Sequence, residues 1–486
     1  MGMARFANAG RFGWGLLLAW LFCTYYTGIA TPSVDWVARM SLLPAGLTPL
    51  FEIVPLLSAM LAIVALIVLE RRRVDIARSR VLLWAGAALC AAGTPLAFSM
   101  EVSAAISLAG IVFTGIGSSV LWMLWGSYYT RIASEDTEAY ACVSAVTAAV
   151  LMFGISFLPG WMSLAAVTLL PLGSGLLLVL AQRDLERADG VAVEDRIEGE
   201  LATDSKRSLG IPPSIWKSAA VLCVMYAFIS LLGQMGVLPN VTSAGFRVAV
   251  IISGTFIAVI GAVSVSGPRR FSVPFLLRWM VPLLVVGFAA IVIFGDESGA
   301  RIASNVSGAG RLGFCLVAQI YFSRFADEGF ATAIQSYGIG WLSVHVGDFI
   351  GLSCGFALSF LMGHGVGLAQ LAGVAIVLAS FMVLIPFGAD GVFQVDRPAE
   401  VDAVSDEPDE AVEVESYEDR VVAFAAESGL TKRETEVFSL LMQGRSVPYI
   451  RDKLVVSRDT VATHVKHIYT KTGVHSRQEL LDLVEK

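Results

Sequence analysis

Twelve apolar runs of membrane-spanning length occupy the first 388 residues of the chain. Crossing ~30 Å of hydrocarbon takes roughly 20 residues of α-helix. Lipid offers no hydrogen bonds to the backbone, so each run predicts a helix that satisfies its own peptide groups. The runs lie at about 12–30, 47–69, 81–98, 103–130, 139–158, 162–181, 216–237, 246–265, 273–294, 303–322, 338–361 and 367–388. The sequence therefore predicts an all-α fold, a polytopic helical bundle of six plus six spans in a lipid bilayer.

The low charge of the chain supports this prediction. Charged residues make up 15% of the sequence and the mean hydropathy is +0.71, whereas a soluble domain carries about 25% charged residues. The N-terminus places basic residues before the 12–30 run, as a signal peptide does, but that run is longer than a signal core and is interpreted as the first span. Six cysteines lie in apolar runs without a CxxC pair, so they are expected to pack, and neither a metal site nor a cofactor is expected.

The basic residues of the connecting loops predict the orientation of the spans, because cytoplasmic loops are enriched in Lys and Arg. With the N-terminus inside, eighteen basic residues fall on the inner side: Arg5, Arg11, Arg71, Arg72, Arg73, Arg78, Arg80, Arg131, Arg183, Arg187, Arg196, Lys206, Arg207, Lys217, Arg269, Arg270, Arg278 and Arg324. Four remain outside or within spans: Arg39, Arg247, Arg301 and Arg311. This bias predicts a multi-pass protein of the inner (cytoplasmic) membrane with both termini in the cytoplasm.

An acidic stretch follows the last span. Residues 390–419 read DGVFQVDRPAEVDAVSDEPDEAVEVESYED, with one basic residue, Arg397. Low hydrophobicity and charge of one sign oppose compact folding and keep such a segment extended. The sequence therefore predicts three regions: a membrane domain over 1–388, a disordered linker over 389–418 and a folded C-terminal domain over 419–486.

The C-terminal domain has the pattern of four short helices. Thr431 and Glu434 form a Thr-x-x-Glu capping box that begins the first helix, and Gly444 can end it. Ser446 begins the second helix and Ser457 the third, whose inward positions at helical spacing are Val461, Val465 and Ile468. A second capping box, formed by Ser476 and Glu479, begins the fourth helix. Four helices with short turns predict a compact domain of about 60 residues.

This tail resembles the LuxR-type C-terminal domain over about 57 residues. The segments LTKRETEVFSLLMQG and VSRDTVATHVKHIYTKTGVHSR carry the resemblance. The matching positions are Leu430, Thr431, Arg433, Glu434, Val437, Leu440, Gly444, Ile450, Leu454, Ser457, Thr460, Val461, His464, Ile468, Lys471, Gly473 and Arg477. The resemblance implies a helix-turn-helix that binds double-stranded DNA as a homodimer, with residues 457–472 as the recognition helix and the fourth helix supporting dimerisation.

The third helix also suggests a DNA-reading surface on chemical grounds. Its outward positions are Arg458, Thr460, Thr463, Lys466, His467 and Lys471. Cationic side chains can neutralise phosphates, and groove-facing side chains can read base edges. The alternative interpretation is a small helical domain whose charged face is merely solvated. Where the family usually carries Lys, this chain has Ala462, which removes one expected DNA contact.

Ionisable residues within spans are the candidates for a ligand site. A charged side chain is costly to bury in lipid, so a residue of this kind within a span usually has a function. Glu52 lies near the outer end of the second span, Arg311 in the tenth, and His345 and Asp348 three residues apart in the eleventh. Arg311 and Asp348 could pair with each other or line a ligand cavity. The aromatic run from Trp122 to Tyr129 is interpreted as an interfacial belt in preference to a binding surface.

Two functions remain open at this point. The six-plus-six arrangement resembles the major facilitator superfamily, although the loop ERRRVDIARSR lacks that family's Gly/Asp frame between spans two and three. The first function is a membrane-embedded transcription regulator that senses an unknown small-molecule signal and binds promoter DNA. The alternative is a secondary transporter of a small solute with an appended DNA-binding tail. No catalytic motif stands out, so an enzyme is not expected.

Overall fold

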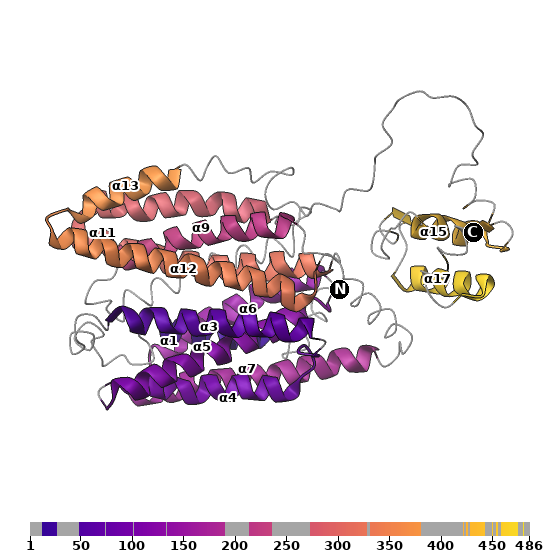
Figure 1. The fold of residues 1–486 in the computed structure, drawn as a ribbon, viewed down its shortest axis with the longest axis horizontal. Coiled ribbons are helices and arrows are strands. Elements are labelled where there is room, and N and C mark those ends of the chain that lie inside the picture. Colours follow the sequence, from indigo (N-terminus) through magenta and orange to yellow (C-terminus); the bar gives the residue numbers. More distant parts are fainter. Residues whose placement is uncertain are drawn as a thin grey trace, which may run out of the picture. The chain divides into compact units, whose positions relative to one another are not determined.

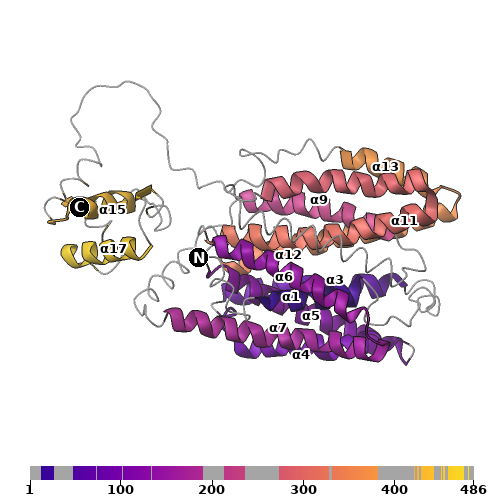
Figure 2. The same ribbon diagram turned by 180° about the vertical axis from the view of Figure 1, so that it is seen from behind.

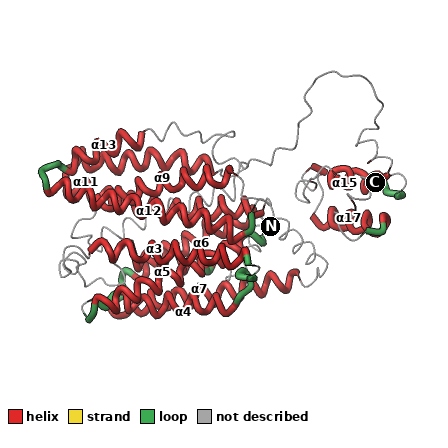
Figure 3. The backbone as a smooth tube through the Cα atoms, viewed as in Figure 1, coloured by secondary structure: helices red, strands yellow, loops and turns green. Residues whose placement is uncertain are grey.

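In the computed structural model of the chain, the described residues form helices connected by loops and turns, and no strand is present among them (Figure 3). These residues are 12–26, 48–72, 74–100, 102–132, 134–189, 213–235, 273–327, 331–380, 421, 424–425, 428–442, 450, 453–454, 458–474 and 480. The chain divides into two compact units, Met1–Glu400 and Val401–Lys486. The predicted span at 246–265, residues 190–212 and the acidic linker lie outside the described residues.

Ten helices of the first unit are described, and they occupy the positions of eleven predicted spans. Seven of them are long and apolar enough to cross a membrane. The ten are α1 (Trp14–Tyr25), α3 (Thr48–Arg71), α4 (Arg80–Ala97), α5 (Ala104–Tyr129), α6 (Ser134–Ile155), α7 (Gly160–Asp189), α9 (Pro213–Met235), α11 (Val273–Asp327), α12 (Ala333–Gly363) and α13 (Leu368–Ser380). The count of twelve spans stays a prediction, because 246–265 is not among the described residues.

The element α11 contains two of the predicted spans as two helical segments that are joined at a kink. Gly295 breaks it with φ of 79° and ψ of −174°, a conformation that costs glycine little because it has no Cβ. The two segments before and after this residue correspond to the runs predicted at 273–294 and 303–322. The two helical segments thus meet at Gly295, next to the polar sequence DESGAR.

The helices of the first unit form two groups that lie side by side (Figures 1 and 2). The first group contains α1 and α3 to α7, with α4 against α5 and α1 against α6 and α7. The second contains α9 and α11 to α13, with α12 against α9 and α11 against α13. Between the groups, α12 contacts α3 and α5, and α11 contacts α6. We call this boundary the seam; it joins the two sequence halves that the six-plus-six pattern predicts.

Small residues allow the closest helix approaches. A Cβ placed on Gly347 or Gly351 of α12 would collide with the backbone of α9 at Cys223 and Ala227. Such close contact is the usual way in which helices associate in lipid, where apolar burial alone gives little preference for a partner. The outer surface of the bundle is apolar instead: Leu61, Val81 and Trp161 expose 72%, 83% and 75% of their area. Large apolar side chains on this surface suit contact with acyl chains.

The second unit has its own apolar core. Its two described helices are α15 (Lys432–Met442) and α17 (Arg458–Thr472), which pack against each other. Val461, Val465 and Ile468 of α17 are buried with Val437 and Phe438 of α15. The inward positions predicted for the third helix are therefore confirmed. The ends assigned to the neighbouring helices at Gly444, Ser446, Ser457, Ser476 and Glu479 lie outside the described residues.

Candidate functional sites

The capping box predicted at the start of α15 is present in the structure. The backbone N–H of Thr431 donates to Oε2 of Glu434 at 2.7 Å, and the backbone N–H of Glu434 approaches the Thr431 hydroxyl at 3.4 Å. These contacts satisfy two of the N–H groups that the first turn of a helix leaves without intrahelical partners. Thr431 and Glu434 thus have the structural role that their spacing predicts.

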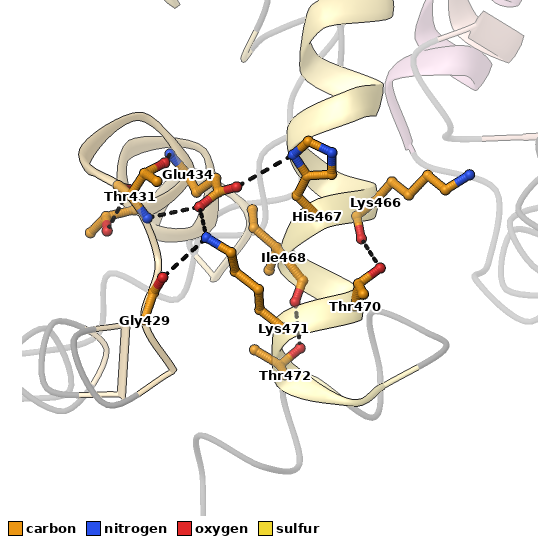
Figure 4. A network of polar contacts seen from close by, with 10 residues as sticks. Gly429, Thr431, Glu434, Lys466, His467, Ile468, Thr470, Lys471 and Thr472 are labelled. Atoms are coloured by element: carbon orange, nitrogen blue, oxygen red, sulfur yellow. Dashed lines mark hydrogen bonds and ion pairs between the residues drawn. The ribbon is translucent and has the colours of Figure 1, made fainter.

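The carboxylate of Glu434 also reaches α17 (Figure 4). Nζ of Lys471 donates to its Oε2 at 2.6 Å and to the carbonyl of Gly429 at 3.1 Å. Nδ1 of His467 lies 3.5 Å from Oε1. The hydrogen bond from Lys471, followed by that from the Thr431 backbone, lowers the pKa of Glu434 to about 2. Glu434 is therefore ionised at every physiological pH and joins the start of α15 to the C-terminal half of α17.

The predicted DNA-reading residues occupy three environments. Thr463 and Lys466 are exposed, and Thr460 is half-buried. His467 and Lys471 contact Glu434, although 56% and 35% of their side-chain areas stay exposed. Arg458 begins α17, and its side chain is outside the described part of the structure. One helix thus presents an outward face around Thr463 and Lys466 and a second edge that faces α15.

A further contact holds the helix-turn-helix together. Arg433 pairs with Glu436 on α15 at 2.5 Å and donates to the carbonyl of Leu454 at 2.7 Å. Leu454 belongs to the second predicted helix of the domain and packs against its core. Because a charge-assisted bond to a backbone carbonyl is directional, Arg433 orients this segment relative to α15.

In the first unit, Arg311 and Asp348 form a buried ion pair. Nη1 of Arg311 lies 2.8 Å from Oδ1 of Asp348, and the two side chains expose 7% and 6% of their areas. The Ser230 hydroxyl donates to Oδ1 of Asp348 at 2.5 Å and accepts from Nη2 of Arg311 at 3.1 Å. Side chains from three helices, α9, α11 and α12, therefore meet at one point. Buried charges are costly unless a partner of opposite charge and hydrogen bonds compensate them, and this arrangement supplies both.

Aromatic rings from both halves enclose the Arg311 guanidinium. Its Cζ lies 4.4 Å from the ring centroid of Tyr26 and 5.4 Å from that of Tyr226, within the range of cation–π attraction. The Tyr26 hydroxyl donates to Oδ2 of Asp348 at 3.4 Å. Tyr26 follows directly after α1, so the ion pair of the second half is tied to the first half across the seam.

Glu52 of α3 contacts α9 one helical turn beyond Ser230. Its Oε2 accepts from Nε2 of Gln234 at 2.7 Å, and Gln234 follows Ser230 by four residues on the same face of α9. We call Tyr26, Glu52, Ser230, Gln234, Arg311 and Asp348 the polar cluster. His345 lies three residues before Asp348 on α12, and its Nδ1 contacts the carbonyl of Trp341 on the same helix at 2.7 Å. Three of the four predicted ligand candidates thus come together.

A layer of aromatic rings also crosses the seam. Trp122 of α5 and Trp341 of α12 have ring centroids 4.2 Å apart, and Trp14 of α1 lies 5.4 Å from Trp122. Trp122, Trp125, Tyr128 and Tyr129 are all at most 4% exposed. The interpretation of this run as an interfacial belt was wrong, because these rings are buried inside the bundle, with Trp122 against Trp341 at the seam and Trp125 against Ser174 within the first half.

Four polar atoms near this layer lack hydrogen bonds within the described part of the chain. They are both amide atoms of Gln319 and the indole nitrogens of Trp14 and Trp341. Gln319 is fully buried, and its backbone carbonyl accepts a hydrogen bond from the Tyr337 hydroxyl at 2.9 Å. Tyr337 lies one turn before Trp341 on α12. Most buried polar groups in proteins are paired, so these atoms are candidates for contact with a bound molecule. Trp14 and Trp341 carry no local sequence signal that would have singled them out.

Comparison with known proteins gives different relatives for the C-terminal unit and for the membrane unit. Residues 428–484 match the family model described as bacterial regulatory proteins, luxR family. Fimbriae Z protein of Escherichia coli (strain K12) is 43% identical over 53 residues, which are 11% of this chain and 25% of that protein. Oxygen regulatory protein NreC of Staphylococcus aureus (strain JH9) is 42% identical over 57 residues, or 12% and 26%. The chain thus spans about a quarter of the length of these relatives.

The membrane unit is similar to a solved transporter structure. The chain aligns with the major facilitator superfamily proton:xylose symporter XylE bound to 6-bromo-6-deoxy-D-glucose, with a TM-score of 0.53 and 15% identity. The alignment covers 77% of this chain and 93% of the symporter. At this identity the likeness shows the fold alone. The chain therefore combines a membrane domain of the major facilitator fold with a LuxR-type helix-turn-helix domain.

Proposed function

We propose that this protein is a membrane-embedded one-component transcription regulator. Its membrane domain senses a small-molecule signal, and its C-terminal domain binds promoter DNA without leaving the membrane. The observation that carries the proposal is the presence, in one chain, of a LuxR-type domain over residues 428–484 and a major facilitator fold. A DNA-binding domain that is attached to a polytopic bundle acts at the membrane surface. A conformational change in the bundle is therefore the signal that we expect to control its DNA binding.

The outward face of α17 is the proposed DNA-reading surface. Thr463 and Lys466 are exposed there, and Arg458 and Thr460 precede them on the same helix. A hydroxyl can read a base edge and a lysine can neutralise a phosphate. The domain is expected to bind as a homodimer to half-sites about one helical turn apart.

Lys466→Ala tests this surface in the intact protein. The variant should bind DNA more weakly at all sequences, and the slope of log affinity against log salt should fall by ~1 if Lys466 meets a phosphate. An unchanged slope would remove Lys466 from the proposed surface.

The seam is the proposed sensing region. The polar cluster connects α1 and α3 of one half with α9, α11 and α12 of the other. A ligand that binds one arrangement of the halves better than another shifts the population toward it. Glu52, Arg311 and Asp348 are the proposed ionic contacts, Gln319 offers an unpaired amide, and His345 beside Trp341 is retained as a further candidate.

Gln319→Leu distinguishes sensing from DNA binding. Genome-wide binding of the intact protein would be mapped with and without candidate solutes, for the wild type and for this variant. The wild type should change occupancy with a particular solute, whereas the variant should bind the same sites without responding. A variant that responds normally would exclude Gln319 from the sensing region.

The proposed action requires that the C-terminal domain lies on the cytoplasmic side. The bias of basic residues supports a cytoplasmic location for both termini. Reporter fusions at residues 200 and 400 should both report a cytoplasmic location. A periplasmic signal at residue 400 would end the proposal, because the domain could then not reach DNA.

The second candidate function is secondary transport of a small solute, and the shared fold with a symporter favours it. This function predicts that residues 1–388 alone move a solute across the membrane, with loss of uptake in variants of Glu52, Arg311 or Asp348. A regulator predicts solute-dependent DNA occupancy without net uptake. Measuring both in the same cells separates the two functions.

A further inference from the structure

The two lysines of α17 have different surroundings. Lys466 and Lys471 are five residues apart, which separates them by about 140° around an α-helix. Figure 4 shows the Lys466 side chain pointing away from Glu434, whereas Lys471 points toward it. Nζ of Lys471 is held by Oε2 of Glu434 at 2.6 Å and by the Gly429 carbonyl at 3.1 Å. The two cations therefore do not present the same face to a partner.

Glu434 is suited to hold Lys471 in this position. Only 5% of its side chain is exposed, whereas 35% of the Lys471 side chain is exposed. The carboxylate is fixed on its other side by the Thr431 backbone N–H. His467, one turn before Lys471, lies 3.5 Å from the second carboxylate oxygen. Glu434 thus contacts both the Lys471 ammonium and the His467 ring at the edge of the outward face.

We propose that Glu434 is a specificity-determining residue of DNA binding, because it withholds Lys471 and His467 from the phosphates. The inference rests on the proposed function, in which α17 meets DNA. Cation–phosphate contacts supply essentially all binding to non-specific DNA, and base contacts supply sequence discrimination. Removing a cation from the phosphate contacts therefore weakens non-specific binding while leaving base contacts in place. Glu434 acts through Lys471 and has no contact with DNA itself.

Glu434→Gln is the matched substitution, since glutamine at this position can still complete the capping box. The full-length chain would be placed in nanodiscs and titrated with a mixed-sequence duplex of about four helical turns over a range of salt. A buffer at about pH 8 keeps an ordinary imidazole neutral. E434Q should increase the magnitude of the salt slope by about 0.9, which over a fourfold change in salt is about a 3.5-fold change in affinity.

Variants at Lys471 separate this role from a merely structural one. Lys471→Met alone should leave the wild-type slope unchanged, and E434Q/K471M should return the slope to the wild-type value. If Glu434 only supported the fold, E434Q would weaken binding without a steeper slope. A slope that falls by about 0.9 in K471M, or an unchanged slope in folded E434Q, would overturn the inference.

The same experiment distinguishes this inference from the proposed function. If the wild-type chain does not bind the duplex at low salt, the proposed function fails before Glu434 is tested. Limited proteolysis of α15 and α17 would show whether E434Q folds. If it does not fold, the salt slope of K471M still tests the inference. An unchanged slope there supports the inference, and a reduced slope overturns it.

Discussion

Substituting Asp348 should destabilise the membrane domain more than any other single change in the polar cluster. Asp348→Asn keeps the size of the side chain but leaves the Arg311 guanidinium, 7% exposed, without its anion at 2.8 Å. At an effective dielectric constant of 20, two unit charges at that distance attract each other by about 6 kcal/mol. Part of this is retained by Ser230 and by the ring of Tyr26. Breaking a buried pair by removing one partner typically costs about 3–5 kcal/mol, and we expect a loss in that range.

The assay is unfolding of the purified protein in detergent micelles, followed by the fluorescence of its buried tryptophans. Glu52→Gln is the matched control, because Glu52 bonds to the neutral Gln234 and should lose only about 1 kcal/mol. The double variant Arg311→Met/Asp348→Leu removes both charges and should recover most of the stability lost in D348N. The reasoning would be refuted if D348N were as stable as the wild type, or if the double variant were no more stable than D348N.

Three other predictions concern the caps and the seam. Thr431→Val removes the hydroxyl of the capping box and should lower the free energy of unfolding of residues 401–486 by about 1 kcal/mol in urea; no change would show that the cap is dispensable. The pKa of Glu434 is lowered from 4.5 to about 2, so its stabilisation is present above pH 4.5 and is lost as pH falls toward 2. Allowing for screening of the partly exposed Lys471, about 2 kcal/mol should disappear over that interval, with a smaller decline in E434Q; equal declines would contradict the assignment. Gly126→Leu should destabilise the bundle by at least about 1–3 kcal/mol, because a Cβ there would lie 2.5 Å from the Tyr337 ring; a thermal midpoint equal to that of the wild type would mean that the seam is not packed this closely.

Much of the local structure could be predicted from the sequence, because it depends on residues that are close together along the chain. Runs of about 20 apolar residues have to become helices in lipid, and helices lie at eleven of the twelve predicted positions. The Thr431–Glu434 spacing specified a cap that the structure contains. The 3.6-residue period correctly placed Val461, Val465 and Ile468 in the core of the C-terminal domain. Each of these inferences involves residues within one or two turns of each other.

Contacts between distant segments were decided by the tertiary structure. Tyr26 and Asp348 are 322 residues apart, and Glu52 and Gln234 are 182 apart. In an apolar helix most faces are hydrophobic, so the sequence pattern does not mark which side meets another helix. The Trp122–Tyr129 run was misread for this reason, since aromatic rings suit both a membrane interface and a packed interior. Lys471 shows the same limit: helical spacing placed it among the outward residues, and only the approach of α15 brought Glu434 to its ammonium.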